Sequence, residues 1–155
     1  MVQDPEGIAE MNRLLGQVCR SHFEQANAML AEVGVYRGQP PLLHALWEDD
    51  GLPQTALADR LGITAATVSK MVQRMERVGL VERREDAEDS RVSRVYLTSE
   101  GWEIRERVEE IWRELAGTML HGLTAEETAE LRRLLERVRD NLKSLGQSSE
   151  RRWTA

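Results

Sequence analysis

The chain has 155 residues, which is enough for one globular domain or for two small subdomains that share a core. Charged residues make up 31% of it and hydrophobic residues 41%, with only 4 prolines, a balance typical of a helix-rich globular protein and not of a disordered one. No apolar run approaches a membrane span and no signal peptide opens the chain, and one cysteine excludes an intramolecular disulfide, so we expect a cytoplasmic protein that does not contact a membrane.

The net charge of −6 is unevenly distributed along the chain. Residues 64–84 carry five basic and two acidic side chains, a local charge of +3, which leaves −9 for the rest. A basic surface on an acidic body still contacts phosphates, and the acidic body disfavours non-specific adhesion elsewhere. The total charge therefore does not exclude nucleic acid as a partner.

Residues 5–33 predict one long helix. Asp4 is a suitable N-cap before Pro5 at the first helical position, and Gly34 ends the segment. Its apolar residues recur at steps of three and four: Ile8, Met11, Leu14 or Leu15, Val18, Ala26, Leu30 and Val33. A helix of this length exceeds what a small core covers, so we expect its surplus apolar face to pack on a later helix or on a second subunit.

Residues 41–48 predict a second helix, and Leu52 a very short strand before the next helical segment begins at Pro53. Residues 57–78 then read as two helices joined by a tight turn.

Three residues in this segment have the spacing of a helix-turn-helix. Ala58 is small enough to let the second helix approach, Gly62 tolerates a positive φ at the corner, and Val68 fills the crossing between the helices. Thr64 is a suitable N-cap for the second helix. The segment therefore predicts a helix-turn-helix.

The second helix of this motif has two distinct faces. The core side carries Val68, Met71, Val72 and Met75, and the opposite side carries Ala66, Lys70, Gln73 and Arg77, flanked by Thr67 and Arg74. Side chains of these polar types donate to base edges and phosphates in a major groove. An ordinary surface helix could carry the same residues, but it would not explain the helix-turn-helix spacing or the hairpin that follows.

Residues 80–84 and 91–97 alternate as strands do, and the polar loop 85–90 joins them into a β-hairpin wing. A helix over residues 99–120 follows, and a capping box, Thr124 to Glu127, opens the last helix, which we expect to end near Leu145. The inner face of the first of these helices is assigned to Trp102, Val108, Ile111, Trp112, Leu115 and Met119. The last helix carries an apolar series at helical spacing: Leu131, Leu134, Leu135, Val138, Leu142 and Leu145.

These elements predict a mainly α fold with a small β-wing. We expect a single domain over residues 1–155, with a winged helix-turn-helix lobe at 39–98, dimerisation helices at 5–34 and 99–145, and a flexible tail at 146–155. In a two-fold dimer the recognition helices would meet major grooves about one turn, ~34–36 Å, apart and read a pseudo-palindrome.

With these features the sequence resembles the MarR family of transcriptional regulators, from its first helix to about Leu145. The most specific likeness is the helix-turn-helix followed by Asp86-Ala87-Glu88-Asp89-Ser90-Arg91 and by Leu97-Thr98-Ser99-Glu100-Gly101, which match the family's wing signature. The resemblance implies a triangular homodimer with interlocked terminal helices, a recognition helix in the major groove and a wing arginine in the minor groove.

By that resemblance Arg91 is the wing-tip arginine, and Asp89 is the carboxylate that orients its guanidinium. The alternative for this pair is an ion pair that only stabilises the turn. Many family members carry a second arginine where this chain has Val92, so basic contacts at the wing could fall instead to three other arginines: Arg83, Arg84 and Arg94.

We therefore expect the DNA-binding residues to be Thr64, Ala66, Thr67, Ser69, Lys70, Gln73, Arg74, Arg77, Arg84, Asp89 and Arg91. Lys70 and Gln73 are the candidates for base readout, whereas Thr67 and Arg74 are expected to lie nearer the DNA backbone.

The resemblance also implies a small aromatic effector bound between the DNA-binding lobe and the dimerisation helices. Candidate lining residues are Arg20, His44, Trp47 and Trp102, for each of which plain core packing is the alternative. One branch of the family senses peroxides through a lone cysteine in the first helix, a role open to Cys19, although a packed cysteine is the simpler interpretation.

No catalytic constellation stands out, and the 3 histidines lack the spacing of metal ligands, so we expect no enzyme, no metal and no cofactor. The sequence predicts a homodimeric regulator, a repressor, that binds double-stranded DNA at a pseudo-palindromic operator and is released by a small effector. The alternatives are a redox-sensing regulator that uses Cys19, and a winged helix that binds another protein and no DNA.

Overall fold

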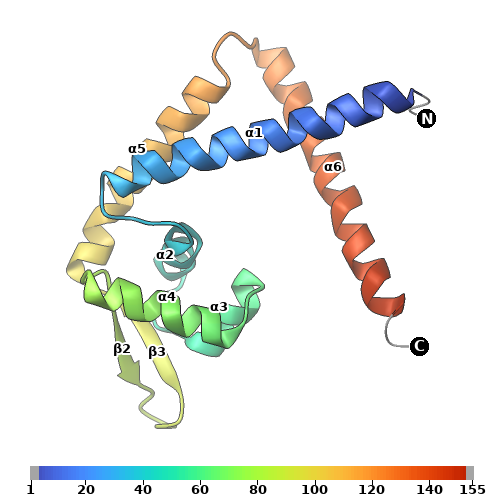
Figure 1. Cartoon of the computed structure of the whole chain (residues 1–155). Helices are drawn as coiled ribbons and strands as arrows, with labels where there is room; N and C mark the ends of the chain where they lie inside the picture. The colour runs from blue at the N-terminus through green and yellow to red at the C-terminus, as the bar shows by residue number, and fades with distance from the viewer. Residues whose placement is uncertain (1–3, 153–155) are drawn as a thin grey trace. The chain divides into compact units, whose positions relative to one another are not determined.

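The computed structural model describes the backbone of residues 4–152 and the side chains of residues 4–144. The elements in chain order are α1 (Pro5–Ala31), α2 (Gln39–Glu48), β1 (Leu52–Pro53), α3 (Gln54–Leu61), α4 (Ala65–Arg77), β2 (Val81–Glu85), β3 (Ser93–Leu97), α5 (Ser99–Met119) and α6 (Ala125–Arg152) (Figure 1). The mainly helical fold with a small wing is confirmed. The chain divides into two compact units, Met1–Leu115 and Ala116–Ala155.

Helix α1 begins as predicted and ends two residues early. The Asp4 side chain accepts a hydrogen bond from the Glu6 N–H and proline follows at the first helical position, whereas the Val33 N–H donates to the Leu30 carbonyl in a turn. Only the C-terminal part of α1 is buried, at Ala26 and Leu30. Helix α2 begins at Gln39, two residues before its predicted start.

The helix-turn-helix is confirmed in its details. Gly62 adopts φ 65° at the corner between α3 and α4, and the next N–H, that of Ile63, donates to the Ala58 carbonyl. Val68 is fully buried at the crossing. The Thr64 hydroxyl oxygen accepts the Thr67 N–H at 3.2 Å, which caps α4.

The three strands form one antiparallel sheet in the order β1-β3-β2. Leu52 of β1 pairs with Val95, and on the other edge of β3 Val81 pairs with Leu97. Both long strands begin later than predicted. Leu80 donates its N–H back to Met75 at the end of α4, and residues 91–92 belong to the loop.

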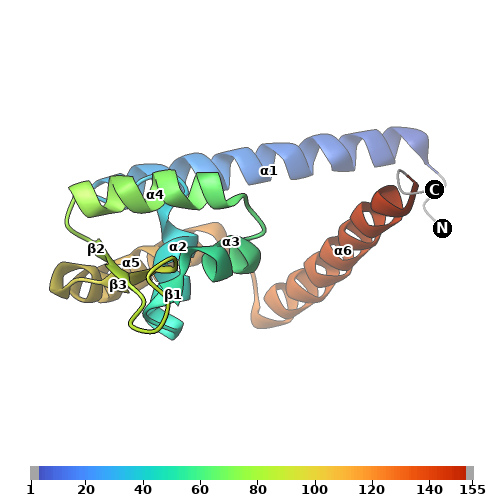
Figure 2. The same ribbon diagram turned by 90° about the horizontal axis from the view of Figure 1, so that it is seen from below.

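One apolar core joins the helix-turn-helix, the sheet and the first half of α5. Its fully buried large side chains include Leu42, Leu43, Leu46, Leu57, Val68, Val72, Met75, Val95 and Val108. Both ribbon views show α2, α3 and α4 gathered beside the wing (Figures 1 and 2). This core fixes the orientation of α4, since Met71 also packs against it.

Helix α5 is held at its start by a close backbone approach. Gly101 lies so near the Leu80 carbonyl that a Cβ built on it would stand 2.1 Å from that oxygen. The indole Nε1–H of Trp47 donates to the Gly101 carbonyl at 2.9 Å. The inner-face assignment is wrong for two residues, since Trp102 is 42% exposed and Met119 is 50% exposed. Trp102 follows the buried Gly101 but turns about 100° away from it around the helix, and Met119 lies in the last turn, beyond Leu115.

The second unit consists of the end of α5, a turn and α6. The predicted capping box is present: the Thr124 N–H donates to Glu127 Oε2 at 2.8 Å, and the Glu127 N–H donates to Thr124 Oγ1 at 3.2 Å. The predicted end of the last helix at Leu145 is wrong, because α6 continues to Arg152. No proline interrupts residues 146–152, so nothing blocks the helical hydrogen bonds there. The side chain of Leu145 and residues 153–155 of the predicted tail lie outside the described residues.

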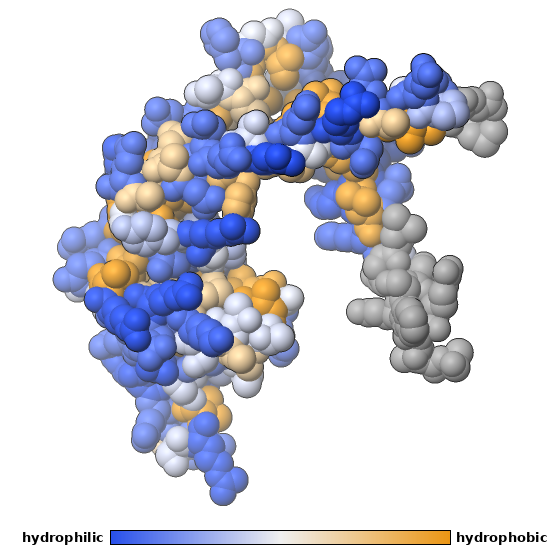
Figure 3. Space-filling view, viewed as in Figure 1, coloured by the Kyte–Doolittle hydropathy of each residue, from blue (hydrophilic) through white to orange (hydrophobic). Residues whose placement is uncertain are grey.

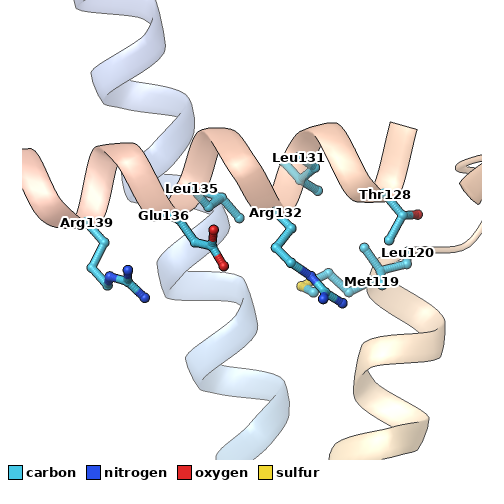
Figure 4. Close-up of a pocket in the computed structure, with 8 residues that line it drawn as sticks. All are labelled: Met119, Leu120, Thr128, Leu131, Arg132, Leu135, Glu136 and Arg139. Atoms are coloured by element: carbon cyan, nitrogen blue, oxygen red, sulfur yellow. The ribbon is translucent and has the colours of Figure 1, made fainter. Parts of the chain in front are cut away.

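Much of the apolar face of α6 is open. Leu134, Leu135, Val138 and Leu142 are 40–58% exposed. Between the end of α5 and α6 lies a groove of about 410 Å³, into which Leu131 and Leu135 point beside Arg132 and Arg139 (Figure 4). No helix within the described residues is long and apolar enough to cross a membrane.

Candidate nucleic-acid interface

The outward face of α4 is polar and exposed, and the opposite face of the helix carries buried apolar side chains. Val68, Val72 and Met75 are completely buried, which turns Lys70 and Gln73 toward solvent. The exposed predicted residues of α4 and its cap are Thr64, Ala66, Thr67, Lys70, Gln73, Arg74 and Arg77, while Ser69 is half-buried. Hydrophilic side chains gather over α4 and at the tip of the wing hairpin (Figure 3).

The cations of α4 are free to meet a ligand. Lys70, Arg74 and Arg77 form no ion pair with any described residue. The acidic residue of this helix, Glu76, is instead paired with Arg83 of β2 at 2.7 Å and also accepts the Arg83 N–H at 3.1 Å. Glu76 therefore ties the helix to the wing and does not neutralise the free cations.

The wing arginines fall into separate roles. Arg83 is engaged with Glu76, and Arg84 pairs with Glu82 while its guanidinium stacks over the Tyr96 ring at 4.7 Å. Both arginines remain exposed, so either can turn to a phosphate.

The turn of the wing is organised by Asp86. Its Oδ1 accepts the N–H groups of Glu88 and Asp89 at 2.9 and 3.0 Å, and its Oδ2 pairs with Arg94, whose Nη1 also donates to the Gly51 carbonyl at 2.9 Å. The hydrogen bond from Arg94, followed by the two backbone N–H groups, lowers the pKa of Asp86 to about 2. Arg94 is therefore committed to the fold of the wing, and its predicted share in DNA contact is not supported.

Asp89 does not hold the guanidinium of Arg91. Its Oδ1 accepts the backbone N–H of Arg91 at 3.0 Å, and the described residues contain no ion pair between the two side chains. The predicted orienting ion pair is therefore wrong. A short aspartate side chain reaches the N–H two residues on more readily than a distant guanidinium. Arg91 is exposed at the wing tip, and its guanidinium forms no ion pair with any residue that the structure describes.

A second site is an apolar pocket of about 330 Å³ where the C-terminal half of α1 meets the start of α2. Its lining includes His22, Phe23, Leu30, Arg37, His44 and Trp112. The His22 and Trp112 rings stack at 6.3 Å, and the Arg37 guanidinium lies 4.7 Å from the centre of the Phe23 ring. The indole Nε1 of Trp112 is buried and has no hydrogen-bond partner among the described residues.

The predicted ligand residues are not brought together. His44 lines the pocket, but Arg20 is exposed on α1, Trp102 is exposed on α5, and Trp47 is buried in the core with its N–H bonded to Gly101. Plain packing is thus the role of Trp47. Sequence reasoning missed His22, Phe23 and Arg37. Trp112 could have been found, because the helical periodicity placed it on the inner face.

Cys19 is exposed on α1. The described residues contain no cluster of three or more histidine, cysteine or carboxylate side chains that could hold a metal ion.

Comparison with known proteins identifies the class. The model of the MarR family matches residues 33–92. The chain is 32% identical over 115 residues to the HTH-type transcriptional regulator YdgJ of Bacillus subtilis, covering 72% of this chain and 68% of that protein. It is 40% identical over 80 residues to the HTH-type transcriptional repressor IacR of Pseudomonas putida, covering 52% of this chain and 48% of that protein. It is 28% identical over 136 residues to the organic hydroperoxide resistance transcriptional regulator of Bacillus subtilis, covering 88% and 89%.

Solved structures agree. The PcaV transcriptional regulator of Streptomyces coelicolor superposes with a TM-score of 0.77 at 28% identity, over 86% of this chain and 97% of that chain. The structure of the same regulator in complex with its natural ligand gives a TM-score of 0.69 at 29% identity, over 83% of this chain and 91% of that chain. The chain is therefore a winged helix-turn-helix protein that binds DNA and regulates transcription. It belongs to the MarR family, and the prediction that it is not an enzyme is confirmed by that membership.

Proposed function

We propose that the protein is a homodimeric repressor that binds a pseudo-palindromic operator in the cytoplasm and is released by a small aromatic anion. The observation that carries the proposal is the exposed, unpaired cationic face of α4 beside the unpaired Arg91 of the wing. Lys70 and Gln73 occupy the centre of that face, where side chains reach base edges in a major groove. Arg91 at the tip suits a narrow minor groove of strong negative potential.

The dimer is supported by the exposed apolar side chains of α1 and α6. On α1, Ile8, Met11, Leu14 and Val18 are 48–64% exposed at helical spacing, and α6 carries its own open apolar face. Contiguous exposed apolar surface of this kind is typical of an interface. A second copy supplies two equal recognition helices, as a palindrome requires.

The effector is supported by the pocket near α1 and α2. Aromatic rings line it, Arg37 supplies a cation, and the buried Trp112 N–H lacks an acceptor. An unpaired buried donor costs about 1–3 kcal/mol, which an acceptor on a ligand would recover. An aromatic carboxylate or phenolate matches these three features. The PcaV regulator, whose fold is similar, has been solved in complex with its natural ligand, which supports a ligand here.

The direct test is a mobility shift against a duplex from upstream of the protein's own gene, repeated over a range of salt. We expect binding with a steep fall of log affinity against log salt, because phosphate contacts release counterions. Arg91→Ala should weaken specific binding at least tenfold, whereas Arg113→Ala, which removes an exposed cation from α5, should not. Binding that is absent or insensitive to salt would favour a winged helix that contacts another protein.

A second candidate function is peroxide sensing by Cys19. Its exposure on α1 and the 88% coverage by the hydroperoxide resistance regulator favour this candidate. The thiolate sulfur would attack the terminal peroxide oxygen and the O–O bond would break; the cysteine would become a sulfenic acid, and the released alkoxide would take a proton from water to give the alcohol. Cumene hydroperoxide should then release DNA from the native protein and not from Cys19→Ser. Equal release from both proteins would exclude it.

A further inference from the structure

A small basic pocket lies where the connector between α1 and α2 meets the C-terminal half of α4. It has a volume of about 290 Å³, and three arginines contribute to its walls: Arg37 from the connector, and Arg74 and Arg77 from α4. Tyr36, Gln39, Met71 and Val78 complete the lining.

None of the three arginines forms an ion pair with a described residue. Glu76 lies between Arg74 and Arg77 in the sequence, but it is paired with Arg83 on the wing. Three cationic side chains that line one cavity favour an anion within it, because like charges repel one another unless an anion lies among them. The pocket therefore has the charge and the donors of an anion site.

Gln39 gives an independent indication. The residue is only 5% exposed, and its Oε1 accepts the Tyr36 N–H at 2.8 Å. Its Nε2 makes no hydrogen bond to a described residue, although the side chain lines the pocket. The Nε2 atom is not fully buried, so its N–H groups are available to an acceptor that binds in the pocket.

The pocket is continuous with the predicted DNA-binding face. Residues 70, 73 and 77 follow one another at helical spacing, so Arg77 belongs both to the base-reading face and to the pocket wall. Tyr36 and Val78, which are 55% and 51% exposed, form its open rim. A backbone that passes beside α4 in a major groove would present its phosphates at this rim.

We propose that this pocket binds a phosphodiester of the DNA backbone, with Arg37 as a DNA-contacting residue outside the helix-turn-helix and the wing. This inference rests on the proposed DNA-binding function. Arg37 and Arg77 hold the two non-bridging oxygens, Arg74 neutralises the charge from the side, and the Gln39 amide donates from the floor. Arginine forks match phosphate geometry, and such contacts set register without reading sequence.

The test is the salt dependence of binding for Arg37→Gln, measured by fluorescence anisotropy on two duplexes, the upstream region and a random sequence of equal length. We expect Arg37→Gln to lose about one phosphate contact per protomer. Each lost contact should lower the magnitude of the slope of log affinity against log salt by about 0.9, and should weaken binding about fivefold near physiological salt. The loss should be equal on both duplexes. Arg113→Gln is the matched control, and thermal unfolding checks that both variants are folded.

A methylphosphonate scan locates the contact. Replacing one phosphate with a neutral methylphosphonate should weaken the native protein at one backbone position per half-site and leave Arg37→Gln unaffected there. If Arg37→Gln keeps the native slope and affinity, as the control does, the inference is wrong while the DNA-binding proposal stands. If the native protein binds neither duplex, both fail.

A free anion is the competing occupant. Inorganic phosphate at constant ionic strength would then raise the unfolding temperature of the native protein and not that of Arg37→Gln, with the DNA slope unchanged. That combination would overturn the inference.

Discussion

Gly101 is the position where one added methyl group should cost most. Its Cβ would stand 2.1 Å from the Leu80 carbonyl oxygen and 3.0 Å from the Leu97 side chain, so a backbone must shift. We expect Gly101→Ala to lower the free energy of unfolding by about 1–3 kcal/mol or more, as overpacking does. Gly117, in the same helix, has nothing within 4 Å of a built Cβ, so Gly117→Ala should stabilise by about 0.5–1 kcal/mol. Urea unfolding of both variants checks the contrast, and equal effects would contradict it.

Asp86 should make the stability of the protein depend on pH. Because its folded pKa of about 2 lies below the ordinary value of 3.8, its carboxylate stabilises the fold fully above pH 3.8 and loses that contribution as pH falls toward 2. We expect Asp86→Asn to be less stable than the native protein at pH 6, with a difference that shrinks between pH 4 and 2. Denaturant unfolding across that range measures it. Glu88→Gln keeps the backbone N–H that donates to Asp86 and removes only a neighbouring carboxylate that makes no hydrogen bond to a described residue, so its stability should follow the native curve. A constant difference for Asp86→Asn would disprove the link.

At the scale of elements, α4 depends on its cap as well as on its buried face. The Thr64 oxygen accepts the Thr67 N–H at 3.2 Å, and the two hydroxyls lie 2.9 Å apart. Thr64→Ala should therefore cost about 1 kcal/mol, whereas Thr64→Ser keeps the acceptor and should cost much less. Thermal unfolding of the two variants, read together with the helical circular dichroism signal, tests this. A loss that serine does not restore would point to the threonine methyl group instead of the cap.

The elements differ in how far they could be predicted. The helix-turn-helix was predictable because its turn depends on local requirements, a positive φ at Gly62 and a cap at Thr64, which neighbouring residues satisfy. The end of α6 was not, because polar residues continue a helix without an apolar period to reveal it. The ion pair of the wing was assigned to Asp89 when Asp86 holds it, since the partner, Arg94, is brought close only by strand pairing.

The two pockets lie beyond local prediction for a related reason. The apolar pocket needs residues from α1, the connector, α2 and α5, and their contact depends on how these four segments pack. Arg37 is in a connector without periodicity, so nothing near it in the chain indicates that it faces Phe23. Trp112 carried a signal through its place in a helical repeat, and His44 was named as a lining residue from the family resemblance.

At the scale of the whole molecule, assembly should depend on the open apolar face of α6. Leu135 is 47% exposed in the single chain, so Leu135→Glu should leave its fold intact but oppose burial against a second copy. We expect sedimentation velocity to show a dimer for the native protein and a monomer, or at least a tenfold weaker dimer, for Leu135→Glu. Arg137→Glu places the same side chain about 200° around the helix and should remain dimeric. A native monomer at micromolar concentration would contradict the proposed assembly.

Arg37 lines both pockets: its guanidinium lies 4.7 Å from the centre of the Phe23 ring in the apolar pocket, and the same residue contributes to the wall of the basic pocket beside α4. A ligand carboxylate in the first and a phosphodiester in the second would compete for one charge, so each partner should be bound more weakly in the presence of the other. Thermodynamic reciprocity then requires that operator DNA lower the affinity for the ligand by the same factor as the ligand lowers the affinity for DNA. A single side chain would in this way serve as the negative coupling between metabolite and operator, without any helix having to move.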